Sequence, residues 1–521
     1  MSYFAPSDIY FNKENERCRK ILRKAKLFII NASILAGTTF LINSITMTFN
    51  VYVSSKIGSE GIGLFQLIMS VYLFAVTVAN SGINLAATRI VSEEMALDKQ
   101  GGAKKAARKC ICYSLILGIT AGVLLSLNAG TIVHLCLHDK ISNTPLYVIS
   151  MGLPFIAMSA AINGYFSAVR KVSKTASSQL LEQAIRIGIT IYLLTILLPK
   201  GLEYACLALI LGDCISEVCS FLYIFMLYQI DKRKLKGNKG AQESYTKRIL
   251  GISVPIALTS YIRSGLSTVK QLIIPSRLEK SGMSCDYALS RYGLIGGMVM
   301  PLLMFPCIII SALSNLLIPE FSAFYAKHNE KRINDIGNKI LKMTLIFSVA
   351  VFGIFFTFHE SLGIVIYNNL EVSKMLRLLC PLVLLMYIDN VVDGMLKGLN
   401  EQVSVMKCNI LDLFVSISFI YFLLPIYGIT GYMIVLYISE ILNATISIRK
   451  LLKITHIKID LIHALIIPLL GFLFARYFVM FCHVQISQEV VALILKVAIF
   501  LISYLMFVVL TSCITRKDIK L

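Results

Sequence analysis

Residues 63–90 read GLFQLIMSVYLFAVTVANSGINLAATRI, and Arg89 is their single charged side chain. At 1.5 Å per residue, a helix of this length exceeds the roughly 30 Å of hydrocarbon in a bilayer. Comparable apolar stretches recur from one end of the chain to the other. The pattern predicts an all-α membrane protein with about fourteen transmembrane helices. We expect them near residues 27–54, 63–90, 110–136, 144–169, 175–199, 201–229, 248–272, 289–318, 338–359, 373–397, 403–424, 428–449, 461–481 and 488–515.

The composition agrees with a membrane protein. Hydrophobic residues make up 57% of the 521 residues and charged residues only 15%. A soluble protein of this length needs more charged surface to cover its core. The chain is therefore expected to be a multi-pass protein of the cell membrane, surrounded by membrane lipids.

The net charge of +21 is distributed unevenly. The basic residues gather in the N-terminal segment, in every second loop and at the C-terminus. By the positive-inside rule this bias predicts that both termini are cytosolic. It accounts for the basic charge without a nucleic-acid partner. The opposite loops hold few basic residues, namely Lys56, Lys140, Lys200, Arg277, Lys280 and Lys374.

Enzyme and cofactor signatures are absent from the sequence. No Walker A, His-Glu-x-x-His or Gly-x-Ser-x-Gly motif occurs. The thirteen cysteines lie mostly in apolar stretches without the paired spacing of a metal site. The sequence therefore predicts a non-enzymatic protein with no cofactor and no catalytic or metal site.

An internal repeat is visible when the chain is compared with itself at an offset of 227 residues. Because six helices separate the two copies, both enter the membrane in the same direction. Parallel repeats of this kind predict two six-helix lobes around a central cavity, with two further helices at the C-terminus. The matched positions include Pro154 with Pro381, Asn163 with Asn390, Gly201 with Gly428, and Asp213 with Glu440.

The repeat divides the chain into five parts. We expect a basic cytosolic segment at residues 1–26, an N-lobe at 27–230 and a basic linker at 231–247. A C-lobe at 248–450 and a C-terminal pair of helices within 451–521 complete the expected organisation.

Two cations stand out in the expected helix 248–272. Arg263 and Lys270 are seven residues apart with Ser267 between them, and seven steps of about 100° come within about 20° of two full turns. A charge at the bilayer centre costs at least about 2.5–3.5 kcal/mol, so such side chains are expected to face a cavity or a partner. The stripe suits a phosphate or pyrophosphate group. Arg89 and Asn84 form a further candidate site for an anionic headgroup, although Arg89 could equally be an interfacial arginine.

Several carboxylates also lie within expected helices. Glu182 stands four residues before Arg186, a spacing that favours a structural pair within one helix. The remaining carboxylates could bind Na⁺ or H⁺, neutralise the cations, or form salt bridges between helices. The candidates for ion coupling are Asp213, Glu217, Asp389, Asp393, Asn409 and Asp412.

Three stretches of the sequence resemble the stage V sporulation protein B family. They are GSEGIGLFQ at residues 58–66, with NSGIN at 80–84, and the segment from Tyr292 through MPLLMFP to Glu320. That family belongs to the multidrug, oligosaccharidyl-lipid and polysaccharide exporter superfamily, which includes lipid II flippases. The resemblance implies two rocking lobes and export of an undecaprenyl-linked saccharide, such as a peptidoglycan precursor for the spore cortex. Relatives of the lipid II type carry arginines on the first helix, whereas this sequence has Asn31, Asn43 and Asn50 there.

The function expected from these features is a flippase that moves a lipid-linked saccharide by alternating access, driven by a coupling cation or the membrane potential. A cation-coupled multidrug exporter of the same superfamily is the nearest alternative and would favour the carboxylates. A membrane-embedded glycan polymerase or ligase is an alternative of another class. It would need acidic or histidine residues clustered at the outer face.

Overall fold

The structure is a computed structural model that describes residues 6–97, 99–136, 142–234, 245–457, 460–482 and 488–513. Side chains are described from Gly37 onward, apart from residues 135 and 136. Much of the basic linker expected at 231–247 and the last residues of the chain lie outside the described part.

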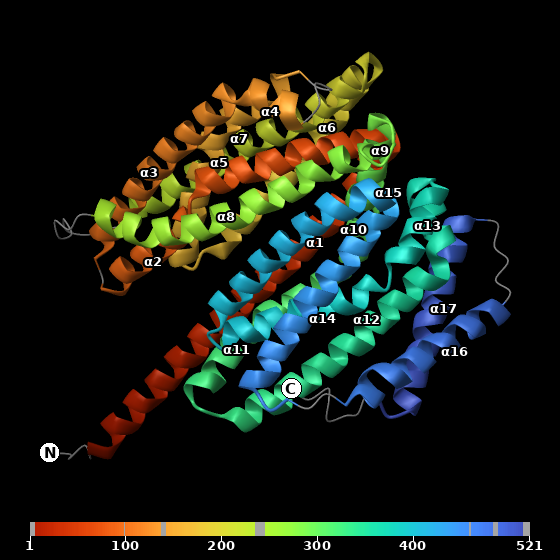
Figure 1. The fold of residues 1–521 in the computed structure, drawn as a ribbon. Helices are drawn as coiled ribbons and strands as arrows, with labels where there is room; N and C mark the ends of the chain where they lie inside the picture. The colour runs from red at the N-terminus through yellow and green to blue at the C-terminus, as the bar shows by residue number, and fades with distance from the viewer. Residues whose placement is uncertain are drawn as a thin grey trace.

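All regular elements of the described residues are helical, as Figure 1 shows. In the first half of the chain they are α1 (Pro6–Asn80), α2 (Ile83–Ala96), α3 (Gln100–Leu127), α4 (Ala129–Cys136), α5 (Thr144–Ala168), α6 (Val172–Leu197), η1 (Leu198–Lys200) and α7 (Leu202–Lys234). In the second half they are α8 (Tyr245–Glu279), α9 (Cys285–Gly293), η2 (Leu294–Val299), α10 (Met300–Met304), α11 (Cys307–Ala326), α12 (Glu330–Tyr367), α13 (Leu370–Leu379), α14 (Leu382–Gly398), α15 (Gln402–Ile454), η3 (Ile462–Ile466), α16 (Ile467–Phe481) and α17 (Glu489–Leu510).

The all-helical membrane fold predicted from the sequence is confirmed. Among the described residues, 11 helices are long and apolar enough to cross a membrane, or 12 if α13 and α14, which meet at 57°, count as one. Two of these long helices are broken at a glycine outside helical geometry, α1 at Gly58 and α15 at Gly428. Each therefore contains two of the expected spans, which accounts for the difference from fourteen.

Equivalent breaks occur in the two copies of the repeat. Gly201, between η1 and α7, has a φ of 124°, and its repeat partner Gly428 has a φ of 53°. Left-handed backbone of this kind is readily adopted by glycine, which has no Cβ. The matching glycines therefore both stand at a positive φ between the fifth and sixth helices of their copy.

The helices form two groups with α8 between them. Helices α2–α7 lie together in Figure 1, and α11–α14 lie on the other side with α16 and α17. Tyr245 and Ile249, at the start of α8, belong to the hydrophobic core of the first group. Near its end, α8 contacts α15, where the guanidinium of Arg277 lies 3.7 Å from the ring centre of Tyr421. One helix thus links both groups.

The two C-terminal helices dock on α12. Phe352 and Phe358 of α12 contact Phe472 of α16 and Phe500 of α17, with ring centres 5.3 Å and 6.0 Å apart. Their buried side chains form a separate hydrophobic cluster. These helices add to the outer surface of the second group and leave its inner face free.

We define the basic end of the bundle as the end that carries residues 99–109, 170–174 and Arg248. At the opposite end the two copies of the repeat cross closely. Ser59 and Ser290 lie with their hydroxyl oxygens 2.6 Å apart, and Gln66 donates to the carbonyl of Gly296 at 2.9 Å. A Cβ at Gly293 would lie 2.0 Å from the carbonyl oxygen of Ser59. Glycine is required here because backbone meets backbone.

We predict that Gly293→Ala separates the two halves at this end, because its methyl group meets backbone atoms that cannot rotate away. Disulfide yield in an S59C/S290C variant, measured by mass spectrometry, is expected to fall several-fold when G293A is added. Gly188→Ala serves as control, since nothing lies within 4 Å of a Cβ at Gly188. Equal yields with and without G293A would contradict the close crossing.

Candidate functional site

Two cavities lie between the groups of helices. One has a volume of about 490 Å³ and is lined by Lys270 together with residues of α1, α6, α7 and α15. The other has a volume of about 570 Å³ and is lined by Arg263 together with residues of α1 and α15. We call them the Lys270 cavity and the Arg263 cavity. They meet at a shared wall formed by Ser70, Leu73, Ser267, Gln271 and Leu413.

The stripe on α8 faces these cavities. Arg263 borders one, Lys270 the other, and Ser267 both. Neither cation has a carboxylate within 4 Å among the residues that the structure describes. The cavities are otherwise rich in neutral polar groups, which suit a hydroxyl-rich ligand. These groups are Asn50, Gln66, Ser70, Thr77, Asn80, Ser260, Ser264, Thr268, Gln271 and Asn409.

Hydrogen bonds fix α8 along the second half of α1 and close one side of the cavities. The hydroxyl of Thr268 donates to the carbonyl of Ser70 at 3.0 Å, and the hydroxyls of Ser264 and Thr77 lie 3.1 Å apart. The stripe is therefore held by a rigid helix pair rather than by a loop.

A cluster of carboxylates lies behind Lys270 in the second group of helices. Asp412 and Glu440 are the carboxylates whose charges act on Lys270. Asp412 accepts a hydrogen bond from Ser439 at 2.6 Å, and Asp389 accepts one from Asn443 at 2.7 Å. The other carboxylate oxygen of Asp389 is buried and has no hydrogen-bond partner among the described residues.

Only part of the predicted ion-coupling set borders a cavity. Asn409 and Asp412 line the Arg263 cavity and Asp213 lines the Lys270 cavity, whereas Asp393 lies 3.7 Å from Lys397. No group of three or more His, Cys, Asp or Glu residues in the described ranges could hold a metal ion.

The prediction that Arg186 pairs mainly with Glu182 is wrong. The Nε of Arg186 lies 2.8 Å from a carboxylate oxygen of Asp213 on the neighbouring helix α7. Both side chains border the Lys270 cavity and are mostly buried. Glu182 and Glu217 are further acidic neighbours. The i,i+4 spacing identifies partners within one helix only. The contact of Arg186 with Asp213 joins two helices, because α6 and α7 pack against each other.

Polar side chains occur at matching positions of the two lobes. In the repeat Glu182 corresponds to Asn409, and Asp213 corresponds to Glu440. Each copy thus places acidic or amide groups between its fifth and sixth helices. The cations differ, since Arg263 and Lys270 correspond to Ala36 and Asn43. The cavity wall is therefore electrostatically asymmetric.

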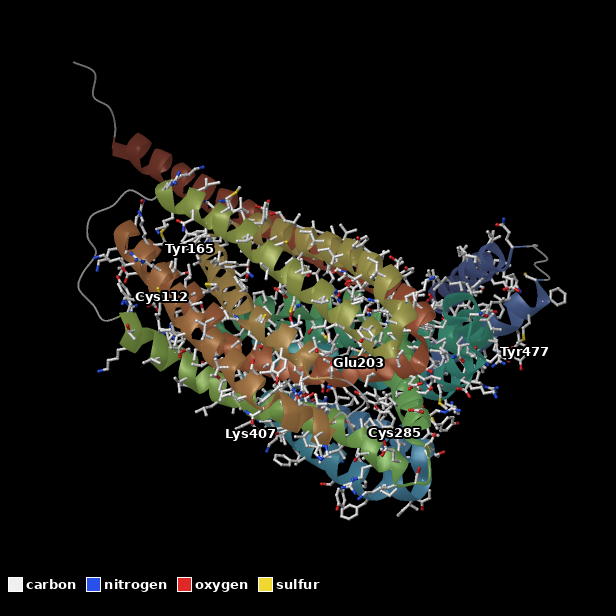
Figure 2. The ribbon with its side chains drawn as sticks, turned by 90° about the horizontal axis from the view of Figure 1, so that it is seen from above. Cys112, Tyr165, Glu203, Cys285, Lys407 and Tyr477 are labelled. Carbon is white, nitrogen blue, oxygen red and sulfur yellow. The ribbon has the colours of Figure 1, made fainter. Side chains whose placement is uncertain are left out.

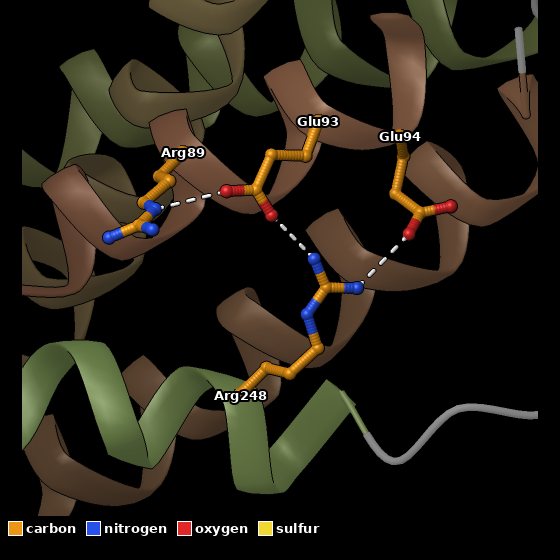
Figure 3. A network of polar contacts seen from close by, with 4 residues as sticks. All are labelled: Arg89, Glu93, Glu94 and Arg248. Carbon is orange, nitrogen blue, oxygen red and sulfur yellow. Dashed lines mark hydrogen bonds and ion pairs between the residues drawn. The ribbon is translucent and has the colours of Figure 1, made fainter. Parts of the chain in front are cut away.

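Arg89 and Asn84 line neither of the two cavities. Arg89 lies at the basic end, where its Nε contacts Glu93 at 3.0 Å. Arg248 of α8 bridges Glu93 at 2.5 Å and Glu94 at 3.2 Å, as Figure 3 shows. The group ties α2 to α8. The sequence analysis placed Arg248 at the start of the expected helix 248–272 without a partner, although the two adjacent glutamates, Glu93 and Glu94, near a helix end were a signal.

A third cation, Arg277, continues the spacing of the stripe but was not among the predicted site residues. Arg277 follows Lys270 by another seven residues and so lies on the same face of α8. In the structure its guanidinium stacks on Tyr421 outside both cavities.

We predict that Asp213→Asn destabilises the protein by about 1–3 kcal/mol, because it leaves the mostly buried charge of Arg186 without its partner. The cost is below that of a dry pair since the cavity gives access to water. R186Q/D213N is expected to recover part of the loss. Thermal unfolding in detergent measures both, and a fully stable D213N variant would argue against the ion pair.

The fold is shared with known membrane transporters. The structure of lipid II flippase MurJ in an inward closed conformation is similar with a TM-score of 0.69 and 15% identity, covering 91% of this chain and 98% of that chain. An inward-facing multidrug resistance MATE family transporter of the MOP superfamily has a TM-score of 0.62 and 17% identity, covering 77% and 92%. The protein therefore shares the fold of these two structures.

The chain belongs to the polysaccharide biosynthesis protein family, whose sequence profile matches residues 28–325. It is 24% identical to stage V sporulation protein B of Bacillus subtilis (strain 168) over 446 residues, covering 84% of this chain and 85% of the relative. It is also 24% identical to lipid II flippase MurJ of the same organism over 422 residues, covering 72% and 74%. The resemblance seen in the sequence is confirmed by the family profile and by the likeness to stage V sporulation protein B.

Proposed function

We propose that this protein is a flippase that carries a lipid-linked saccharide across the cell membrane, with its diphosphate on Arg263 and Lys270. The observation that carries the proposal is a pair of cations on one helix face, bordering two adjoining cavities, with no described carboxylate within 4 Å. Leaving two such charges in the membrane is costly unless an anionic ligand or water compensates them. A diphosphate supplies the complementary charge.

The lining residues support a saccharide as the remainder of the cargo. Amide and hydroxyl groups surround the stripe, and these pair with sugar hydroxyls without a net charge. Family membership and the stage V sporulation protein B and MurJ relatives agree with a peptidoglycan precursor or a related glycan. We propose that its use in spore cortex synthesis follows from the same likeness.

The proposed transport path follows α8. With the basic end in the cytosol, as the charge bias predicts, the headgroup reaches Arg263 first and Lys270 second, while the lipid tail stays in the bilayer. The close crossing at Ser59 and Ser290 must then open for release. The contact of Arg248 with Glu93 and Glu94 must open for entry.

The multidrug exporter remains the competing candidate because MATE transporters share the fold. A cationic drug needs an exposed acidic site, whereas the carboxylate of Asp213 is already paired with Arg186. Besides this pair, the cavities are lined by two cations, Arg263 and Lys270, and by one carboxylate, Asp412, so the charge of their lining is net positive. This distribution favours an anionic cargo.

We predict that R263Q/K270Q lowers transport at least tenfold, because each charged hydrogen bond to a phosphate contributes about 1.5–3 kcal/mol. The measurement is the amount of lipid-linked precursor exposed on the outer surface of cells that depend on this protein. K247Q/K280Q removes two charges near the ends of α8, outside both cavities, and is expected to transport normally. Full transport by a well-expressed R263Q/K270Q variant would refute the diphosphate assignment.

We further propose that Asp389 and Asp412 couple transport to a cation, H⁺ or Na⁺. Asp389 offers a buried carboxylate oxygen without a hydrogen-bond partner among described residues, and Asp412 borders the Arg263 cavity near Lys270. A cation bound here changes the charge behind the stripe, which alters how strongly the stripe holds an anion.

The prediction for coupling is that D389N/D412N transports at a rate that no longer responds to an imposed gradient. Vesicles with a Na⁺ gradient, a pH gradient or neither distinguish the ion. S439A, which removes only the hydroxyl donated to Asp412, is expected to retain the response. An unchanged gradient response in D389N/D412N would exclude this cluster as the coupling site.

A further inference from the structure

A second pair of cations without a described carboxylate partner lines neither cavity and lies at the end opposite the basic end. The guanidinium of Arg377 in α13 lies 5.7 Å from the ring centre of Phe356, and that of Arg476 in α16 lies 5.1 Å from it. Two helices separated by about a hundred residues therefore direct their arginines to one aromatic ring of α12. Neither residue belonged to the predicted sites.

The position of this pair is unusual for a membrane protein. Glu371 of α13 contacts Arg291 at 2.7 Å, next to the crossing at Ser290, so the pair lies at the end that is poor in basic residues. Arginines there do not serve the positive-inside rule. Their convergence needs another explanation.

Phe356, the ring that both arginines face, is part of a cluster of aromatic side chains. Phe356 contacts Phe352 with ring centres 5.5 Å apart and Phe472 with ring centres 5.9 Å apart. Phe472 precedes Arg476 by one turn of α16, so ring and guanidinium dock on α12 together. The ring faces stabilise the cations but leave their N–H groups free to donate to a ligand.

No carboxylate lies within 4 Å of either guanidinium in the part of the chain that the structure describes. The acidic side chain that follows Phe356 by one turn, Glu360, is 76% exposed and lies 3.8 Å from His359. Lys374 adds a further positive charge one turn before Arg377. The local charge is therefore positive and unbalanced.

The residues around Arg476 indicate that this site lies in the headgroup region of the bilayer. Arg476 is five residues from the end of α16, about 7.5 Å along the helix axis. Its neighbours Tyr477 and Phe481 are 70% and 85% exposed, and Tyr477 lies at the edge of the molecule in Figure 2. Exposed aromatic residues near a helix end mark the headgroup region of a bilayer.

We propose that Arg377 and Arg476, held over Phe356, bind the phosphate group of a membrane lipid in the leaflet at this end. Two guanidinium groups supply paired N–H donors to phosphate oxygens, and the exposed apolar faces of α16 and α17 accept the acyl or prenyl chain. The site exists only because the C-terminal helices α16 and α17 dock on α12. Lipid binding would therefore be a role for these two helices, which lie outside the repeat. It does not depend on the transported cargo.

The test uses the purified full-length protein, stripped of lipid in detergent, and native mass spectrometry with added phosphatidylglycerol or phosphatidylcholine. Wild-type protein is expected to prefer phosphatidylglycerol, and R377Q/R476Q to bind it about tenfold or more weakly. K200Q/K280Q removes two charges at the same end and is expected to match wild type. R377K/R476K keeps the charge without paired donors and is expected to lie between them.

A polyprenyl diphosphate, added in competition, identifies the source of the phosphate. Displacement of phosphatidylglycerol from wild type, but not from R377Q/R476Q, means that either lipid occupies the site. Equal phosphatidylglycerol binding by wild type, R377Q/R476Q and the lysine variant would overturn the proposal and leave the arginines a packing role on Phe356. If R377Q/R476Q fails to fold, R377K/R476K decides, since undiminished binding there removes the need for paired donors.

Discussion

The structure depends on the high cost of placing charge in the hydrocarbon of a membrane. Each ionisable side chain within a spanning helix must find a partner, reach the headgroup region or face a cavity. Arg186 finds Asp213, and Arg248 bridges Glu93 and Glu94. Arg263 and Lys270 have no such partner in the described part of the chain, and both border cavities. The paired charges therefore stabilise the fold, and the unpaired charges mark the candidate site.

The same constraint explains why α8 is central to the proposed mechanism. It joins the core of one group of helices at Tyr245 and contacts α15 of the other group near Arg277. Between these attachments it presents the cationic stripe. A movement of one group against the other must therefore change the surroundings of the stripe, which is the requirement for alternating access.

The duplicated sequence supplies the frame but not the chemistry. Matching glycines at Gly201 and Gly428 produce equivalent turns, and matching acidic or amide positions lie between the fifth and sixth helices of each copy. The two cations without a described carboxylate within 4 Å, Arg263 and Lys270, both belong to the second copy. An asymmetric site within a nearly symmetric frame can bind a ligand that itself has a charged end and a neutral end.

The sequence by itself determined the helical membrane fold, the repeat and the face shared by Arg263, Ser267 and Lys270, because these follow from apolar length and helical period. Tertiary structure alone decided that Arg186 pairs with Asp213 rather than Glu182, and that Arg89 and Asn84 lie outside the described cavities. It also brought Arg377 and Arg476 to one ring across about a hundred residues. Helical period places side chains on a face, but the partner of that face is set by packing between helices, which a single sequence does not encode locally.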